Sequence, residues 1–184
     1  MRNIFKRRTS IEKMIDVVRN SWNELAKAIA TGKIVVKNDK QNEDQIRTEF
    51  FRILRNKGLQ VVPEYKCQLS QGTHKTATGK AKIDLLLAIA YEEHPAIAIE
   101  LKHFPKVQGA TTTDNRTSIL KDVENIEAYI RDNIADVGFC LMYTNDRYYM
   151  DDSRSKINIG DCGYQLEWQT YNDEQDCFLA IMVE

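Results

Sequence analysis

The sequence predicts an α/β fold in which one mixed central sheet is flanked by helices. Segments with helical apolar periodicity alternate with short apolar runs that are bounded by turn residues, and this alternation is typical of α/β domains. The length of 184 residues allows one domain with a sizeable core. A charged fraction of 29% and a hydrophobic fraction of 42% exclude a disordered or fibrous chain.

Net charge, apolar runs and cysteine spacing narrow the class of protein further. The net charge of -1 indicates no overall basic surface, so any basic patch must be local. No stretch reaches the apolar length needed to cross a bilayer, and the basic start at Met1–Arg8 precedes an amphipathic segment, not an apolar signal core. Four widely spaced cysteines form no C-x-x-C pair, which disfavours structural zinc and fits reduced thiols. We therefore expect a cytoplasmic protein without membrane association.

Residues 1–41 are predicted to form a helical extension. A helix is expected over about residues 10–31, with Thr9 and Glu12 as a capping box and Gly32 after its end. Its apolar residues recur at steps of three and four: Ile11, Met14, Ile15, Val18, Trp22, Leu25, Ala26 and Ile29. The basic residues before it predict a disordered tail, with a nucleic-acid-binding arm as the alternative: Arg2, Lys6, Arg7 and Arg8.

The next segments predict a second helix and the first strand. The helix is expected over Glu43–Lys57, and its buried stripe comprises Ile46, Phe50, Ile53 and Leu54. Leu59–Lys66 is expected to be a strand, at an edge of the sheet because Pro63 cannot donate a backbone hydrogen bond. Residues 68–80 are polar and aperiodic, and predict a loop.

The remaining elements complete the predicted sheet. Lys82–Ala90 and Ala96–Lys102 are short apolar runs around a polar turn, so we expect a hairpin that is buried on both faces. A third helix is expected around Ile119–Ile130, on which Lys121 and Asp122 are expected to be exposed charges, with contact to substrate as the alternative. The elements expected after it are a strand at Val137–Tyr143 and a hairpin formed by Tyr164–Tyr171 and Cys177–Val183.

Three charged residues interrupt the apolar hairpin. If Ala90 faces His94 across the turn, the register places Asp84 directly opposite Glu100. Opposed side chains on one face have Cβ atoms about 4.5–5.5 Å apart. Lys102 points to the same face as Glu100, because side chains alternate along a strand.

Two such close carboxylates in an apolar setting require compensation. Mg²⁺ supplies it, because this ion binds carboxylate and water oxygens at about 2.0–2.1 Å. We expect Asp84, Glu100 and the carbonyl of Leu101 to hold the metal ion. The ammonium of Lys102 would then assist the attacking water and stabilise charge on a phosphoryl group. The alternative is a structural ion pair of Lys102 with Asp84 or Glu100.

This pattern, D-(x15)-E-L-K with each acid in an apolar strand, resembles the PD-(D/E)XK nuclease superfamily. The resemblance covers residues 42–145, the expected catalytic core, and leaves 146–184 as a C-terminal β segment. Ile83 stands where the family often has proline. The resemblance implies a restriction-endonuclease-like fold and hydrolysis of DNA with Mg²⁺, for which Mn²⁺ can substitute.

The family often has a further glutamate on its first helix, where Glu43 and Glu49 are the candidates. With about 100° per residue and Ile46 at zero, Glu43 falls near 60° and Glu49 near -60°, whereas the buried stripe centres near 20–25°. We therefore favour Glu43, expected to orient the attacking water, over Glu49. Glu64 at the end of the first strand is another candidate acid, with a solvated strand-end residue as the alternative.

Basic residues near the proposed site are candidates for contacts with nucleic acid. A solvated lysine-rich surface is the alternative for all of them: Lys66, Lys75, Lys80, Lys82, His103 and Lys106. A catalytically inactive nucleic-acid-binding or assembly module is the alternative function. Cleavage of both DNA strands needs two active sites, so we also expect a homodimer, or a protein partner that recognises the target.

Overall fold

A computed structural model describes all residues except 1, 38–41, 89–94, 107–111 and 152–156. Six described strands form one sheet in the order β1-β2-β3-β4-β6-β5. Strands β3 and β4 are parallel, whereas the other neighbouring pairs are antiparallel. The strands are β1 (Gln60–Gln68), β2 (Lys80–Ala88), β3 (Pro95–Phe104), β4 (Val137–Thr144), β5 (Leu166–Tyr171) and β6 (Asp176–Val183). The prediction of an α/β chain with a mixed central sheet is confirmed.

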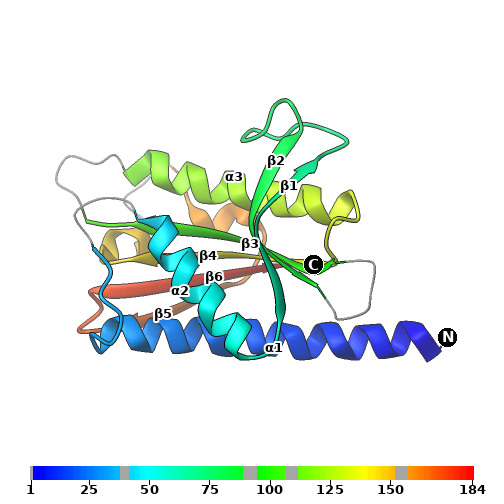
Figure 1. Ribbon diagram of the computed structural model, residues 1–184. Coiled ribbons are helices and arrows are strands. Elements are labelled where there is room, and N and C mark those ends of the chain that lie inside the picture. Colours follow the sequence, from blue (N-terminus) through cyan, green and yellow to red (C-terminus); the bar gives the residue numbers. More distant parts are fainter. Residues whose placement is uncertain (1, 38–41, 89–94, 107–111, 152–156) are drawn as a thin grey trace.

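Helices cover both faces of this sheet (Figure 1). On one face, α1 (Arg2–Ala30) and α2 (Glu43–Asn56) pack over a core that includes Trp22 and Phe50. On the other face, α3 (Thr112–Arg131) packs over a second core that includes Ile126. Short 3-10 turns, η1 (Arg147–Met150) and η3 (Ile159–Cys162), connect β4 to the C-terminal hairpin. No described helix has the length and apolarity that crossing a membrane requires.

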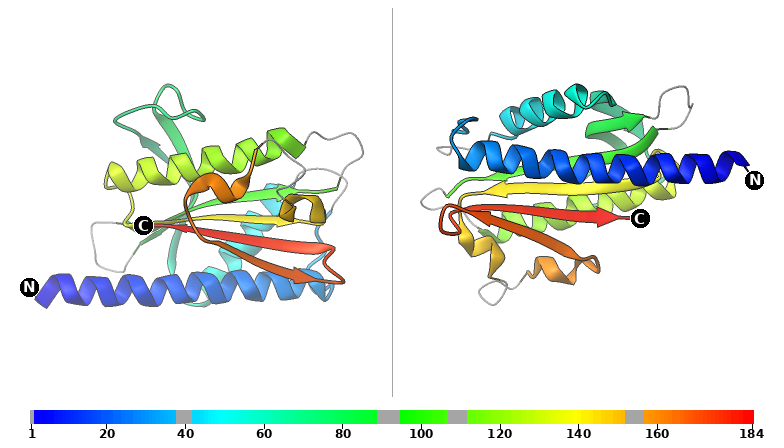
Figure 2. Two further views of the ribbon diagram at one scale, coloured as in Figure 1. Left: turned by 180° about the vertical axis from the view of Figure 1, so that it is seen from behind. Right: turned by 90° about the horizontal axis from the view of Figure 1, so that it is seen from below.

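Helix α1 is longer than the sequence predicts. It begins at Arg2, so the Thr9–Glu12 pattern lies inside the helix and does not cap it, and the predicted disordered tail is wrong. No glycine or proline lies between residue 2 and Gly32, so no residue interrupts the backbone. The first turns of α1 extend past the edge of the sheet (Figures 1 and 2).

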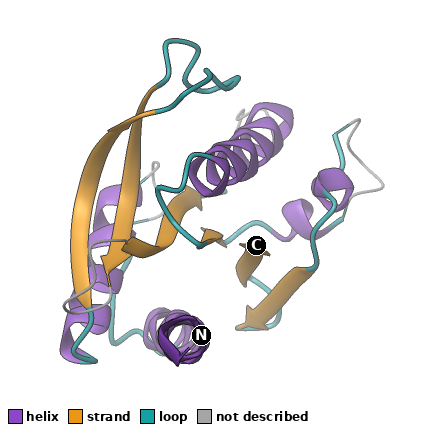
Figure 3. Cartoon of the chain, turned by 90° about the vertical axis from the view of Figure 1, so that its right-hand side faces the viewer, coloured by secondary structure: helices purple, strands orange, loops and turns teal. Residues whose placement is uncertain are grey.

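The β1–β2 hairpin changes its packing face at Asp84. Ala81 and Ile83 pack in the core under α3, whereas Leu85 and Leu87 pack in the core under α1 and α2. The strand partner of Asp84 is Glu64, which has a left-handed φ of 52° that an extended strand does not contain. The hairpin therefore bends away from the sheet, and β1 is an edge strand (Figure 3), as Pro63 predicts.

Candidate active site

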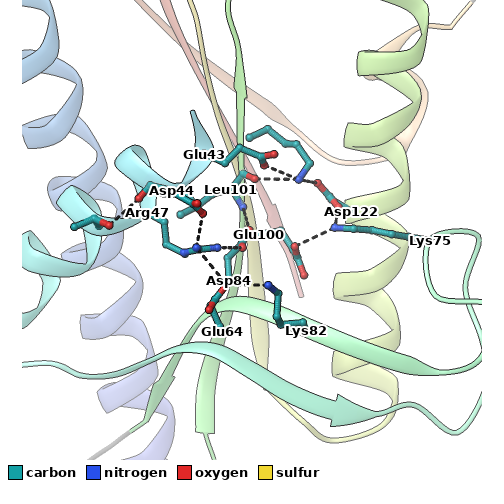
Figure 4. Close-up of polar contacts among 12 residues, drawn as sticks. Glu43, Asp44, Arg47, Glu64, Lys75, Lys82, Asp84, Glu100, Leu101 and Asp122 are labelled. Atoms are coloured by element: carbon teal, nitrogen blue, oxygen red, sulfur yellow. Dashed lines mark hydrogen bonds and ion pairs between the residues drawn. The ribbon is translucent and has the colours of Figure 1, made fainter. Parts of the chain in front are cut away.

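The charged residues of the hairpin line one pocket of about 380 Å³, beside the point at which the β2–β3 ladder ends. Helix α2 contributes Glu43, strand β2 contributes Asp84, and strand β3 contributes Glu100 and Lys102 (Figure 4). The pocket thus brings together the four residues that the sequence proposes for catalysis, from segments separated by up to about 60 positions.

Asp84 occupies the position that the predicted register gives it. The ladder pairs Leu85 with Ile99, as the predicted register requires. Nearer the turn the register shifts by one residue, so that Ala88 pairs with Pro95, and the predicted pair Ala90–His94 lies outside the described residues. Backbone pairing stops at Leu85 and Ile99, and the Asp84 carboxylate instead accepts a hydrogen bond of 2.8 Å from the backbone N–H of Leu101. It also pairs with Arg47 of α2 at 3.1 Å. The Asp84 side chain therefore forms a hydrogen bond to β3 at the point where backbone pairing between β2 and β3 ends.

Glu100 is a buried carboxyl group with only 1% of its surface exposed. It accepts a hydrogen bond of 2.8 Å from the hydroxyl of Tyr129 on α3 and lies 3.3 Å from the ammonium of Lys75. Burial raises the pKa of Glu100 to about 8, and repulsion from Asp122 adds to the effect, while Lys75 opposes it. Glu100 thus retains charge only with the help of a nearby cation.

Lys102 is the cationic centre of the pocket. Its ammonium lies 2.9 Å from Glu43, 3.0 Å from Asp122 and 3.0 Å from the carbonyl oxygen of Leu101. Burial favours the neutral amine, but the charges of Asp122 and Glu43 outweigh burial and raise the pKa of Lys102. Lys102 is therefore a permanent cation at neutral pH. Burial also raises the pKa of Glu43, although Lys102 opposes this shift.

The ion pairs that form differ from the predicted alternatives. Lys102 pairs with Glu43 and Asp122 instead of Asp84 or Glu100. The register of the β2–β3 hairpin cannot predict these partners of Lys102, because they come from two helices on opposite faces of the sheet.

Asp122 is the main residue that the sequence reasoning misplaces. It is fully buried, and its two carboxylate oxygens contact the ammonium groups of Lys75 and Lys102. Helical periodicity contains the signal, because with Ile119 at zero and about 100° per residue Asp122 falls near -60°. That angle lies at the margin of the stripe, between Ile126 at about -20° and Tyr129 at about -80°. The prediction of an exposed charge on α3 is wrong.

The predicted phosphate-contacting residues occupy three different environments. Lys80 and Lys82 are exposed and line the rim of the pocket, and Lys66 faces Lys82 across the hairpin. Lys75 turns its ammonium inward to Glu100 and Asp122. Lys106 is exposed but is not among the residues that line the pocket.

His103 is buried, so the prediction that it contacts nucleic acid is wrong. Its side chain is fully buried, and its ring stacks on Tyr143 with centroids 5.2 Å apart. Nδ1 accepts a hydrogen bond of 2.9 Å from the backbone N–H of Asn42. Burial lowers the pKa of His103 to about 4, so the ring is neutral. The physical reason is alternation, since His103 faces the opposite side of β3 from Lys102.

The two further candidate acids lie outside the centre of the site. Glu64 is 48% exposed and pairs with Arg47 at 3.2 Å and Lys82 at 2.8 Å. Glu49 pairs with Arg52 at 3.0 Å and does not line the pocket. Of the two helix glutamates, Glu43 is therefore the one beside Lys102.

The oxygen donors of the pocket suit a hard divalent cation. Asp84 and Glu100 offer carboxylates and Leu101 a carbonyl, and Mg²⁺ prefers such ligands and retains several waters. Within the described ranges, no three acidic, imidazole or thiol side chains form a metal-binding group. The ammonium of Lys75 instead lies between Glu100 and Asp122 as a stand-in cation. The donor chemistry fits Mg²⁺ with two carboxylate ligands, and the position next to Glu100 attracts positive charge.

Comparison with models of known protein families, with characterised proteins and with solved structures finds no match to this chain.

Proposed function

We propose that the protein is a Mg²⁺-dependent nuclease of the PD-(D/E)XK type, with a restriction-endonuclease-like fold, that hydrolyses phosphodiester bonds of DNA. One observation carries the proposal: Asp84, Glu100 and Lys102 line a single pocket at the end of the β2–β3 ladder, with Glu43 beside the amine. A purely structural role would not need this many charges, because buried ion pairs seldom stabilise a fold more than apolar packing does.

The proposed chemistry divides the work among these residues. Asp84, Glu100 and the Leu101 carbonyl would hold Mg²⁺, which when bound polarises a phosphate group and makes water more acidic. Lys102 remains charged and stabilises the negative charge that grows on the phosphoryl oxygens. Glu43 orients the attacking water by accepting its hydrogen bond. A bond forms from water to phosphorus as the ester P–O bond breaks, with no covalent enzyme intermediate.

DNA as substrate follows from the family resemblance and is supported by charge around the pocket. Lys80 and Lys82 lie on the rim, and Lys66 is opposite Lys82 on β1. Like charges directly opposite each other destabilise a strand pair. Exposed ammonium groups this close together suit the binding of a polyanion.

The test is cleavage of plasmid and single-stranded DNA with Mg²⁺, Mn²⁺ or a chelator. Wild-type protein should cleave only with metal, and Asp84→Asn and Lys102→Met should each reduce the rate by at least about 100-fold. Glu49→Gln, on the same helix as Glu43 but outside the pocket, is the matched control and should retain activity. Equal cleavage by wild type and both site variants would indicate a contaminating nuclease and remove the support for this proposal.

An inactive nucleic-acid-binding or assembly module is the second candidate. It is favoured by the charge balance of the pocket, since Arg47, Lys75 and Lys102 each form an ion pair with one of its acids. Such a module would bind DNA in a filter-binding assay, with or without chelator, and would cleave nothing in either condition.

A further inference from the structure

The loop between β1 and β2, residues 69–79, lies against α3 mainly through polar contacts. Ser70 bonds to Asp132 through its backbone N–H at 2.6 Å and its hydroxyl at 2.7 Å. His74 contacts Glu124 at 2.8 Å, and Thr73 donates to Asn125. Apart from Leu69, no apolar side chain of this fully described loop is buried. The Ser70 and His74 contacts are exposed and cost little to open individually, whereas the Thr73–Asn125 contact is buried and is the firmer anchor.

Lys75 is the one residue of this loop whose charge enters the candidate active site. Its ammonium contacts Asp122 and lies 3.3 Å from Glu100, and Figure 4 shows it reaching these acids from the side of α3. Its side chain is 34% exposed, so the cation has a short path to solvent. Glu100 is 1% exposed and has no other cation among its described ion pairs. Lys75 therefore supplies the charge that a buried Glu100 carboxylate requires.

A divalent cation and Lys75 cannot both neutralise Glu100 at full strength. A doubly charged ion beside Glu100 repels the ammonium at short range in a low-dielectric pocket. The ammonium has an alternative position, because the Lys75 side chain is 34% exposed and solvent is near. Lys102 has no such freedom, since it is 7% exposed and belongs to a central strand.

We propose that Lys75 is a tethered cation that competes with a divalent metal ion for Glu100 and is displaced when that ion binds. Displacement loosens the exposed contacts of Ser70 and His74 beside α3 and presents the Lys75 ammonium at the mouth of the pocket, where a substrate phosphate would enter. This inference rests on the proposed function for the identity of the metal ligands, but it concerns metal exchange and not cleavage.

The first test compares Mn²⁺ binding by wild type, Lys75→Met and Lys82→Met, measured by calorimetry or by the electron paramagnetic resonance signal of free Mn²⁺. Both variants remove one positive charge from the pocket lining, but only Lys75 contacts Glu100. Lys75→Met should bind Mn²⁺ about ten-fold more tightly than wild type, equivalent to about 1.4 kcal/mol. Lys82→Met should change the dissociation constant by less than about three-fold.

The second test needs no variant. Hydrogen exchange of the amides of Ser70 and His74, which donate to Asp132 and Glu124 beside the loop, is measured with and without Mg²⁺. Loosening of these contacts should raise these exchange rates several-fold when Mg²⁺ is added, while the amides of β4 remain protected.

Equal metal affinity of the two methionine variants, or unchanged loop exchange on metal binding, would overturn the role of Lys75. Absence of Mn²⁺ binding in wild type and Lys75→Met alike would overturn both this inference and the proposed metal site. Metal binding with loosened loop contacts, but without DNA cleavage, would retain the role of Lys75 and reject the nuclease. The two proposals are therefore separable.

Discussion

Replacing Asp122 by asparagine should destabilise the folded protein by about 3 kcal/mol. Removal of one partner of a buried ion pair costs about 3–5 kcal/mol, because the remaining charge loses its compensation. Asp122 is fully buried and contacts two ammonium groups. Lys102 and Lys75 each keep one other carboxylate, Glu43 and Glu100, and Lys75 is partly exposed. These remaining contacts place the expected loss at the lower end of the range.

Urea unfolding followed by circular dichroism measures this loss. With an m-value of about 2 kcal/mol/M, the transition midpoint should fall by about 1.5 M while m stays unchanged. Glu127→Gln is the matched control, because Glu127 lies on the same helix, is exposed and accepts one hydrogen bond from Tyr164. It should change stability by less than about 0.5 kcal/mol, as surface substitutions do.

A second substitution tests the cause of the loss. The double variant Asp122→Asn with Lys75→Met also removes one of the cations that Asp122 compensates. The loss in free energy of unfolding should therefore be smaller than the sum of the two single losses by at least about 0.5 kcal/mol. A loss below about 0.5 kcal/mol for Asp122→Asn alone would refute the reasoning. It would mean that Asp122 is solvated on α3, as the sequence suggests.

Three other predictions concern packing and assembly. Gly138→Ala should lower the free energy of unfolding by about 1–3 kcal/mol, because the new Cβ would lie 2.0 Å from Cγ2 of Ile126. Adding Ile126→Ala to the same chain should relieve part of this clash. Additive losses of stability in urea unfolding would contradict the clash. Arg116→Met should lower the free energy of unfolding by about 3 kcal/mol, since the buried guanidinium donates to the carbonyls of Tyr148, Asp151 and Ile157. A thermal unfolding midpoint equal to that of wild type would exclude this stabilising role. We also expect a homodimer through the extended start of α1; light scattering that gives one chain mass with and without DNA would reject it.

The elements that depend on local pattern were predictable from the sequence. Helix α2, the strands and the C-terminal hairpin lie within about two residues of their predicted bounds, because burial of one face imposes a period on the apolar residues. The β2–β3 register was predictable because an antiparallel hairpin constrains which residues face each other. Glu43 was distinguished from Glu49 by the same helical geometry.

Predictions that depended on the default behaviour of charged residues were less successful. Asp122 and His103 were assigned to solvent or ligand because polar residues are usually exposed. In the structure Asp122 is buried with two lysines and His103 stacks on Tyr143. Each is stabilised by partners that are distant in the sequence, and local periodicity does not identify such partners.

By itself, the sequence determined which segments are helices and strands and that Glu100 and Lys102 share one face, since both follow from periodicity along a single strand or helix. It also determined the alignment of Leu85 with Ile99, since an antiparallel hairpin constrains which residues face each other. Only the tertiary structure decided the electrostatics of the pocket. Packing of α3 and of the β1–β2 loop against the sheet places Asp122 and Lys75 next to Glu100 and Lys102. Charges interact through space, and the energy of each interaction depends on how deeply the charges are buried. Neither the partner of a charged residue nor the interaction energy therefore follows from its position in the chain.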